Sequence, residues 1–136
     1  VNIGRATSLK PGGLGLGLAK CVALRKLIFQ AGDSNLAESS RHEALWEGLG
    51  HCGNLRSLEA DLCNSELGDA RGLGRCVARL TKLRHLHLDV TGARVPDLDD
   101  LARSILHCPQ LARATLVLNH VKTLVSLDRF GAAIKE

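Results

Sequence analysis

The stretch CVARLTKLRHLHLD, residues 76–89, decides the fold because its pattern occurs four times in this chain. Its core reads L-x-x-L-x-x-L-x-L and covers residues 80–88. Segments 21–29, 52–60 and 108–116 follow the same frame, so the four copies begin at positions 21, 52, 80 and 108. A nearly constant period of this size is typical of stacked repeats, in which each unit buries its apolar face against its neighbours.

Each copy predicts one helix followed by one short strand. The first apolar position of the helical pattern recurs at Leu14, Leu45, Leu73 and Leu101. A second apolar residue follows each of them four positions later, which is the spacing of one helical face. The form L-x-L then changes the period to two, so the Leu side chains point inward and the residue between them points outward. Successive strands run in one direction, so we expect a parallel sheet with helices on one face.

Small residues recur between the two apolar positions of each helical pattern. They are Gly17, Gly48, Cys76 and Ser104. We expect this column to let each helix approach the sheet closely. Ahead of the first helix, the segment PGG at 11–13 is expected to act as a helix breaker.

Three features resemble leucine-rich repeats of the long, ribonuclease-inhibitor-like class. They are the frame LxxLxL, the period of about 28 residues and the helical form L-x-x-x-L-x-x-C. The segment LGDARGL at 67–73 is similar to the turn and helix opening of that class. The resemblance implies an α/β leucine-rich repeat solenoid, a curved parallel sheet of about four short strands with helices on the convex side. It also implies protein binding on the concave sheet face, usually without catalysis.

The repeat pattern divides the chain into three parts. Residues 14–123 are expected to form the array of about four units, and 1–13 the tail of a preceding repeat or an N-terminal cap. Apolar residues continue the helical spacing after this array, so 124–136 are expected to form a terminal capping helix or the start of a further repeat. We therefore expect a segment of a larger adaptor or receptor, or an accessory subunit of a multiprotein complex.

The outward positions of the four strands form a grid that we predict to bind a protein partner. Neighbouring strands lie about 4.8 Å apart, and alternate residues along a strand about 6.7 Å apart. Glu59 should therefore lie beside His87, and Asp61 beside Asp89. The grid consists of Lys26, Ile28, Gln30, Ser57, Glu59, Asp61, His85, His87, Asp89, Arg113, Thr115 and Val117.

A basic rim is expected where the strands begin. Arg25, Arg56 and Arg84 occupy the same repeat position there, about 5 Å apart. One explanation is that cations near helix C-termini complement the helix macrodipole. The other is that this self-repelling ladder is neutralised by an acidic protein partner.

An alternative interpretation places a metal-dependent or pH-dependent site on the two central strands. The side chains for it would be His85, His87, Asp89, Glu59 and Asp61. Strand side chains stand parallel, however, whereas metal ligands must converge to about 2 Å from one ion. The preferred interpretation therefore includes neither a metal nor a cofactor.

Composition and motifs argue against catalysis and nucleic-acid binding. The net charge is only +4, and two Phe, one Trp and no Tyr leave few rings on which bases could stack. The segment GGLGLGL at 12–18 lacks the Lys-Ser/Thr and the preceding strand of a phosphate loop. We find no Ser elbow and no exposed Cys-His pair, so we do not expect an enzyme.

The cysteines predict the cellular compartment. The repeat position that Leu80 fills in the third copy holds Cys21, Cys52 and Cys108 in the others. These are expected to be small buried hydrophobes, and without paired spacing they favour free thiols in a reducing compartment. Cys63 and Cys76 lie outside this column and are expected to be more reactive.

Apolar runs in this sequence are too short to predict a membrane span, which needs about 18 residues. We therefore expect no membrane insertion and an intracellular location. The cytoplasm is preferred, and an organelle, reached by a chain with a processed N-terminus, is the alternative.

Overall fold

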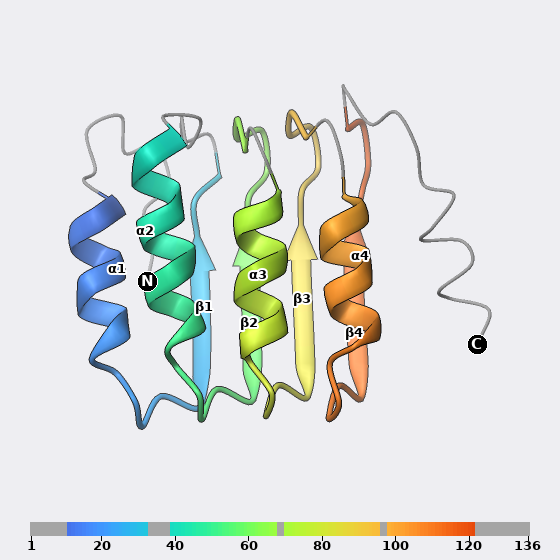
Figure 1. Cartoon of the computed structure of the whole chain (residues 1–136). Helices are drawn as coiled ribbons and strands as arrows, with labels where there is room; N and C mark the ends of the chain where they lie inside the picture. The colour runs from blue at the N-terminus through green and yellow to red at the C-terminus, as the bar shows by residue number, and fades with distance from the viewer. Residues whose placement is uncertain (1–10, 33–38, 68–69, 96–97, 122–136) are drawn as a thin grey trace.

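Helices and strands alternate along the whole described part of the chain (Figure 1). The computed structural model describes residues 11–32, 39–67, 70–95 and 98–121. The expected terminal parts at 1–10 and 124–136 lie outside these residues. The elements are α1 (Pro11–Ala19), β1 (Lys26–Gln30), α2 (Ser39–Gly50), β2 (Ser57–Asp61), α3 (Arg71–Arg79), β3 (His85–Asp89), α4 (Asp99–Leu106) and β4 (Arg113–Val117).

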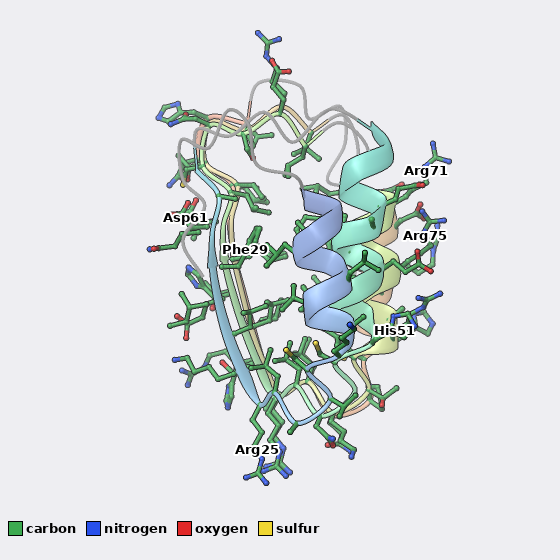
Figure 2. All side chains as sticks on the ribbon, turned by 90° about the vertical axis from the view of Figure 1, so that its left-hand side faces the viewer. Arg25, Phe29, His51, Asp61, Arg71 and Arg75 are labelled. Atoms are coloured by element: carbon green, nitrogen blue, oxygen red, sulfur yellow. The ribbon has the colours of Figure 1, made fainter. Side chains whose placement is uncertain are left out.

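The four strands form one parallel sheet in the order β1-β2-β3-β4. Residues from the same position of the repeat face each other, so Leu27 pairs with Leu58, and Leu58 with Leu86. The helices lie together on one face of this sheet (Figures 1 and 2). The predictions of an α/β protein, a parallel sheet, and this register are confirmed.

The hydrophobic core lies between the sheet and the helices. The inward Leu residues of the strands and the Leu residues before them are almost fully buried, including Leu55, Leu58, Leu83, Leu86 and Leu88. The pattern weakens in β4, where Ala114, expected inward, is exposed and Leu116 only half-buried. The reason is that β4 is the edge strand of the described sheet and has a strand on one side only.

Truncation of a central Leu tests this seam. Leu83→Ala is expected to lower the free energy of unfolding by about 2 to 5 kcal/mol, because it leaves a cavity in a fully packed layer. Leu83 has 0% of its surface exposed. Urea unfolding followed by circular dichroism gives the difference.

The matched control is Thr81→Ala, two residues earlier on the surface. It is expected to change the free energy of unfolding by less than about 0.5 kcal/mol. Unfolding midpoints for Leu83→Ala and Thr81→Ala that agree with each other would contradict the layered core.

Glycines bring neighbouring helices together, which the sequence interpretation assigned to contact with the sheet. A Cβ on Gly48 of α2 would lie 2.7 Å from the Cα of Gly15 in α1 and still nearer its carbonyl oxygen. A Cβ on Gly74 would lie 3.0 Å from the carbonyl carbon of Asp100 in α4. Gly17, by contrast, faces open space. The predicted role of the small column was therefore wrong, because the close contacts run from helix to helix.

Two Gly→Ala substitutions separate helix contact from helix propensity. Gly48→Ala is expected to lower the free energy of unfolding by about 1 to 3 kcal/mol, because the new methyl group meets backbone that cannot move aside alone. Gly17→Ala meets no atom within 4 Å. It is expected to raise stability by about 0.5 to 1 kcal/mol, the gain of replacing Gly inside a helix.

Thermal unfolding of both variants beside the wild type measures this difference. Two changes of the same sign and size would show that Gly48 does not mark a helix contact.

The segment PGG at 11–13 forms the first turn of α1 instead of breaking it. A proline fits there because its missing N–H is one of the amides that have no partner in the first turn of any helix. The helix therefore begins three residues ahead of Leu14, where the apolar pattern starts.

Candidate functional site: the outward face of the sheet

The face of the sheet opposite the helices carries the predicted grid. Burial alternates along β1 and β3, with the Leu and Phe positions buried and the positions between them facing outward. All twelve grid residues are exposed or half-buried, and Ile28 has 44% of its surface exposed. Side chains project from this face of the strands in Figure 2, where Asp61 is labelled.

Two adjoining hollows lie on this face. One has a volume of about 200 Å³ and lies over β1, β2 and the end of β3, beside Gln30, Asp61 and Asp89. The other has a volume of about 390 Å³ and lies over β2, β3 and β4, beside His85, Arg113 and Thr115. Glu59 and His87 line both hollows, so they form the centre of the face.

Charges are paired across the strands at this centre. The Nζ of Lys26 lies 2.8 Å from Oε1 of Glu59. The hydrogen bond from Lys26 lowers the pKa of Glu59; partial desolvation opposes this, and the charges of Lys26 and His87 favour it. The expected neighbours Glu59 and His87 are Cα partners in the sheet.

Carboxylates gather where the central strands end. Asp61 and Asp89 are Cα partners, as predicted from the repeat. Their Oδ1 atoms accept hydrogen bonds from the backbone N–H groups two residues later, Cys63 at 3.1 Å and Thr91 at 2.9 Å. Burial opposes the ionisation of Asp89, but hydrogen bonds from Thr91 and Cys63 and the nearby His87 outweigh it and lower the pKa of Asp89. Each carboxylate is thus fixed by its own turn.

The turns beyond these carboxylates repeat as well. Asn64, Gly92 and His120 occupy the same position in successive repeats and have φ angles of 54°, 67° and 53°. This left-handed conformation favours Gly and Asn. Backbone hydrogen bonds join successive turns, from Asn64 N–H to the Thr91 carbonyl and from Gly92 N–H to the Asn119 carbonyl, each 2.8 Å long. The repeat therefore fixes the turns together with the strands.

The basic rim lies where it was expected, at the amino ends of the strands. Arg25, Arg56 and Arg84 are exposed, and Arg25 is labelled at this edge in Figure 2. The backbone N–H of Arg56 donates to the Arg25 carbonyl at 2.8 Å, and that of Arg84 to the Arg56 carbonyl at 2.9 Å. The next position of the ladder is Ala112, so the rim spans three of the four strands.

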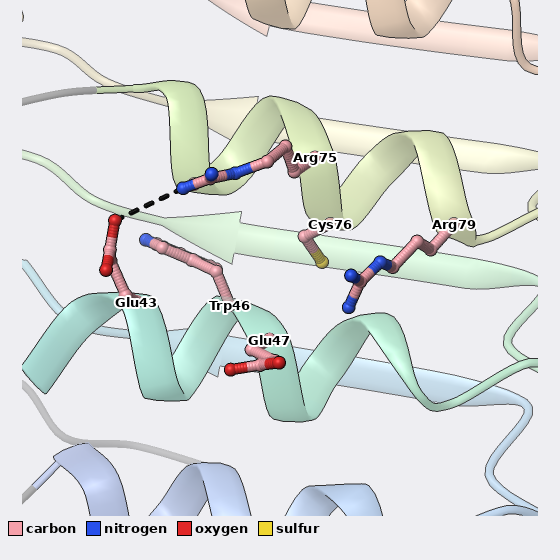
Figure 3. A pocket seen from close by; sticks show the side chains of 7 residues that line it. Glu43, Trp46, Glu47, Arg75, Cys76 and Arg79 are labelled. Atoms are coloured by element: carbon pink, nitrogen blue, oxygen red, sulfur yellow. Dashed lines mark hydrogen bonds and ion pairs between the residues drawn. The ribbon is translucent and has the colours of Figure 1, made fainter.

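A cavity that was not predicted lies between α2 and α3 on the helix face (Figure 3). Its volume is about 170 Å³, and an ion pair between Arg75 and Glu43, 3.2 Å long, closes one end. Trp46 forms part of its wall and packs edge-on against Phe29, with ring centroids 6.2 Å apart. Opposite charges at helical positions of neighbouring repeats were the signal for it, since Glu47 and Arg75 occupy the same repeat position.

The described residues contain no group of three or more His, Cys, Asp and Glu side chains that could hold a metal ion. The five residues of the alternative site are among those described, on two parallel strands. The metal-dependent interpretation thus has no ligand set on the sheet.

Two predictions about the cysteines were wrong. Cys21 is exposed although Cys52 and Cys108, at the same repeat position, are buried. In these two, Sγ donates to a carbonyl of the preceding unit, Cys52 to Leu18 at 3.3 Å and Cys108 to Leu80 at 3.6 Å. Cys21 has no described unit ahead of it and donates to Gly17 of its own helix at 3.4 Å.

Cys63 and Cys76 were expected to be the reactive thiols, but their surroundings suppress reactivity. Burial raises the pKa of Cys76 to about 12. Partial burial, hydrogen bonds to Asp61 and Asp89, and the charges of these carboxylates raise the pKa of Cys63 to about 12. Because the thiolate is the nucleophile, both side chains are poor nucleophiles near neutral pH.

Thiol labelling tests this assignment. At pH 8 in the folded protein, a disulfide-exchange reagent is expected to modify Cys21 quickly and the other four thiols only after unfolding in urea. The substitution Cys21→Ser is expected to abolish the fast phase and leave the slow one unchanged. A fast phase that survives in Cys21→Ser and disappears in Cys63→Ser would contradict the raised pKa of Cys63.

None of the helices in the described ranges has the length and apolarity needed to cross a bilayer. Comparisons of the chain with protein-family models, curated proteins and solved structures found no match.

Proposed function

We propose that this chain is a leucine-rich repeat solenoid of the long, ribonuclease-inhibitor-like class, and that it is a non-catalytic scaffold for protein–protein interaction. It binds its partner on the outward face of the sheet, the concave face of such a solenoid. It serves as a segment of a larger adaptor or receptor, or as an accessory subunit of a multiprotein complex.

One observation carries this proposal: none of the described helices covers the outward face of a parallel sheet (Figure 2). Parallel sheets usually have both faces covered. The open face here is lined by polar and charged side chains over two hollows, so it suits contact with another protein better than burial in a core.

The repeat assignment is supported by features that recur at the same spacing. Strand register, left-handed turn residues and the buried Cys and Leu positions all follow one constant period over the last three units. Units that bury their apolar faces only against their neighbours are the defining property of repeat proteins.

A non-catalytic role is supported by the chemistry of the candidate nucleophiles. Cys63 and Cys76 hold their protons to high pH. Ser57 and His85 are Cα partners on the outward face, yet no hydrogen bond joins their side chains. An activated hydroxyl needs its base within hydrogen-bond reach.

A reducing, intracellular location, with the cytoplasm preferred, is supported by the thiols. All five cysteines are free, and three of them are buried within the core. Free buried thiols are typical of proteins kept under reducing conditions.

Substitution at the centre of the face tests the proposal. His87→Ala is expected to weaken partner binding, because His87 lines both hollows, and to leave the unfolding curve unchanged, because its side chain is exposed. Tagged wild type and variant are compared by quantitative affinity purification from cells of the source organism.

The matched control is Arg103→Ala on α4, an exposed residue of the helix face whose ion pair with Asp100 is too exposed to affect stability by more than about 1 kcal/mol. Partners held by the wild type and by Arg103→Ala but released by His87→Ala would support the outward face. Partners released by Arg103→Ala and held by His87→Ala would place binding on the helices instead.

A further inference from the structure

Cationic side chains form a continuous band across the amino ends of all four strands. The band has two rows, the basic rim and the first outward position of the strands. It consists of Arg25, Lys26, Arg56, Arg84, His85 and Arg113. Backbone hydrogen bonds between neighbouring strands hold the rows in register, so the side chains of one row stand about 4.8 Å apart.

Most of the charge in this band has no counter-charge. Lys26 pairs with Glu59, but Arg25, Arg56, Arg84 and Arg113 form no ion pair with any described residue. Like charges at this spacing repel each other. An anion bound along the band would relieve this repulsion.

Helix dipoles do not account for the band. Their effect falls off within the last turn of a helix. Arg25 stands six residues after the end of α1, and Arg56 six residues after the end of α2. Arg113 stands seven residues after the end of α4. These positions are at the starts of strands, where the helix macrodipole is too weak to select a cation.

Charge reverses along the strands. Asp61 and Asp89 lie four residues beyond the first outward position, about 13 Å along the sheet. An acidic ligand is attracted to the amino end of the face and repelled from the carboxyl end. The polarity therefore fixes its place over the band and over the hollow of about 390 Å³ beside His85 and Arg113.

We infer that the occupant of this face is an acidic segment of a protein, which lies across the amino ends of the strands on this band. The inference rests on the proposed function and adds the chemistry of the partner. A protein segment fits better than a nucleic acid because both described aromatic residues, Phe29 and Trp46, are buried and offer no ring for base stacking.

Direct binding of peptide probes tests this inference. A fluorescently labelled Glu-rich peptide, long enough to cross all four strands, is titrated with the full chain, and binding is followed by anisotropy in low and moderate salt. A Lys-rich peptide of the same length and a single-stranded oligonucleotide are the comparison probes. The Glu-rich peptide is expected to bind best, and its affinity to fall as salt screens the band.

Charge reversal locates the contact. The double variant Arg56→Glu, Arg84→Glu is expected to weaken binding of the Glu-rich peptide at least about tenfold, whereas Arg56→Lys, Arg84→Lys retains it. Arg75→Glu, Arg103→Glu makes the same change in net charge on the helix face, and is expected to stay within about twofold of the wild type. Circular dichroism confirms that each variant is folded.

Three results would overturn the inference: equal loss of binding in the two charge-reversal variants, preference for the Lys-rich peptide, and preference for the oligonucleotide. Failure of all probes, while His87→Ala still releases a cellular partner, would also reject the acidic segment and leave the proposed function standing. Loss of both would reject the outward face itself.

Discussion

Pairing of identical repeat positions across a parallel sheet is the constraint on which the rest of this structure depends. Hydrogen bonds between strands set residues of successive units side by side, and the Leu residues of all units then share one buried layer. A single helix and strand could not bury that layer alone. Because side chains alternate across a strand, the register that closes the core also orders the outward residues into rows.

The same constraint explains how weak local signals become a surface. A single Arg before a strand is an ordinary solvated residue, but the register repeats it at about 4.8 Å on the neighbouring strands. Asp61 and Asp89 become neighbours in the same way at the other end of the sheet. The polarity of the face is thus a property of the stack, and every unit contributes one part of it.

Packing between units also accounts for the behaviour of the thiols and the helices. Cys52 and Cys108 are buried because a preceding unit covers them and supplies a carbonyl acceptor. Gly15 and Gly48 let α1 and α2 touch through their backbones. Trp46 fills the space behind this contact, against Phe29 of the sheet. Each of these roles requires a neighbour at the correct distance, in addition to the residue itself.

The amino-acid sequence by itself determined the period, the order of helix and strand, the parallel register and the outward grid. These follow from spacing alone, since a period of two separates the faces of a strand and a constant repeat length aligns its copies. The tertiary structure alone decided that the small residues serve helix contacts, that Cys21 is exposed, and that Cys63 stands between two carboxylates. It alone revealed the left-handed turns and the cavity beside Glu43 and Arg75. These features depend on distances between units and on solvent access, which a one-dimensional pattern of residue types does not contain.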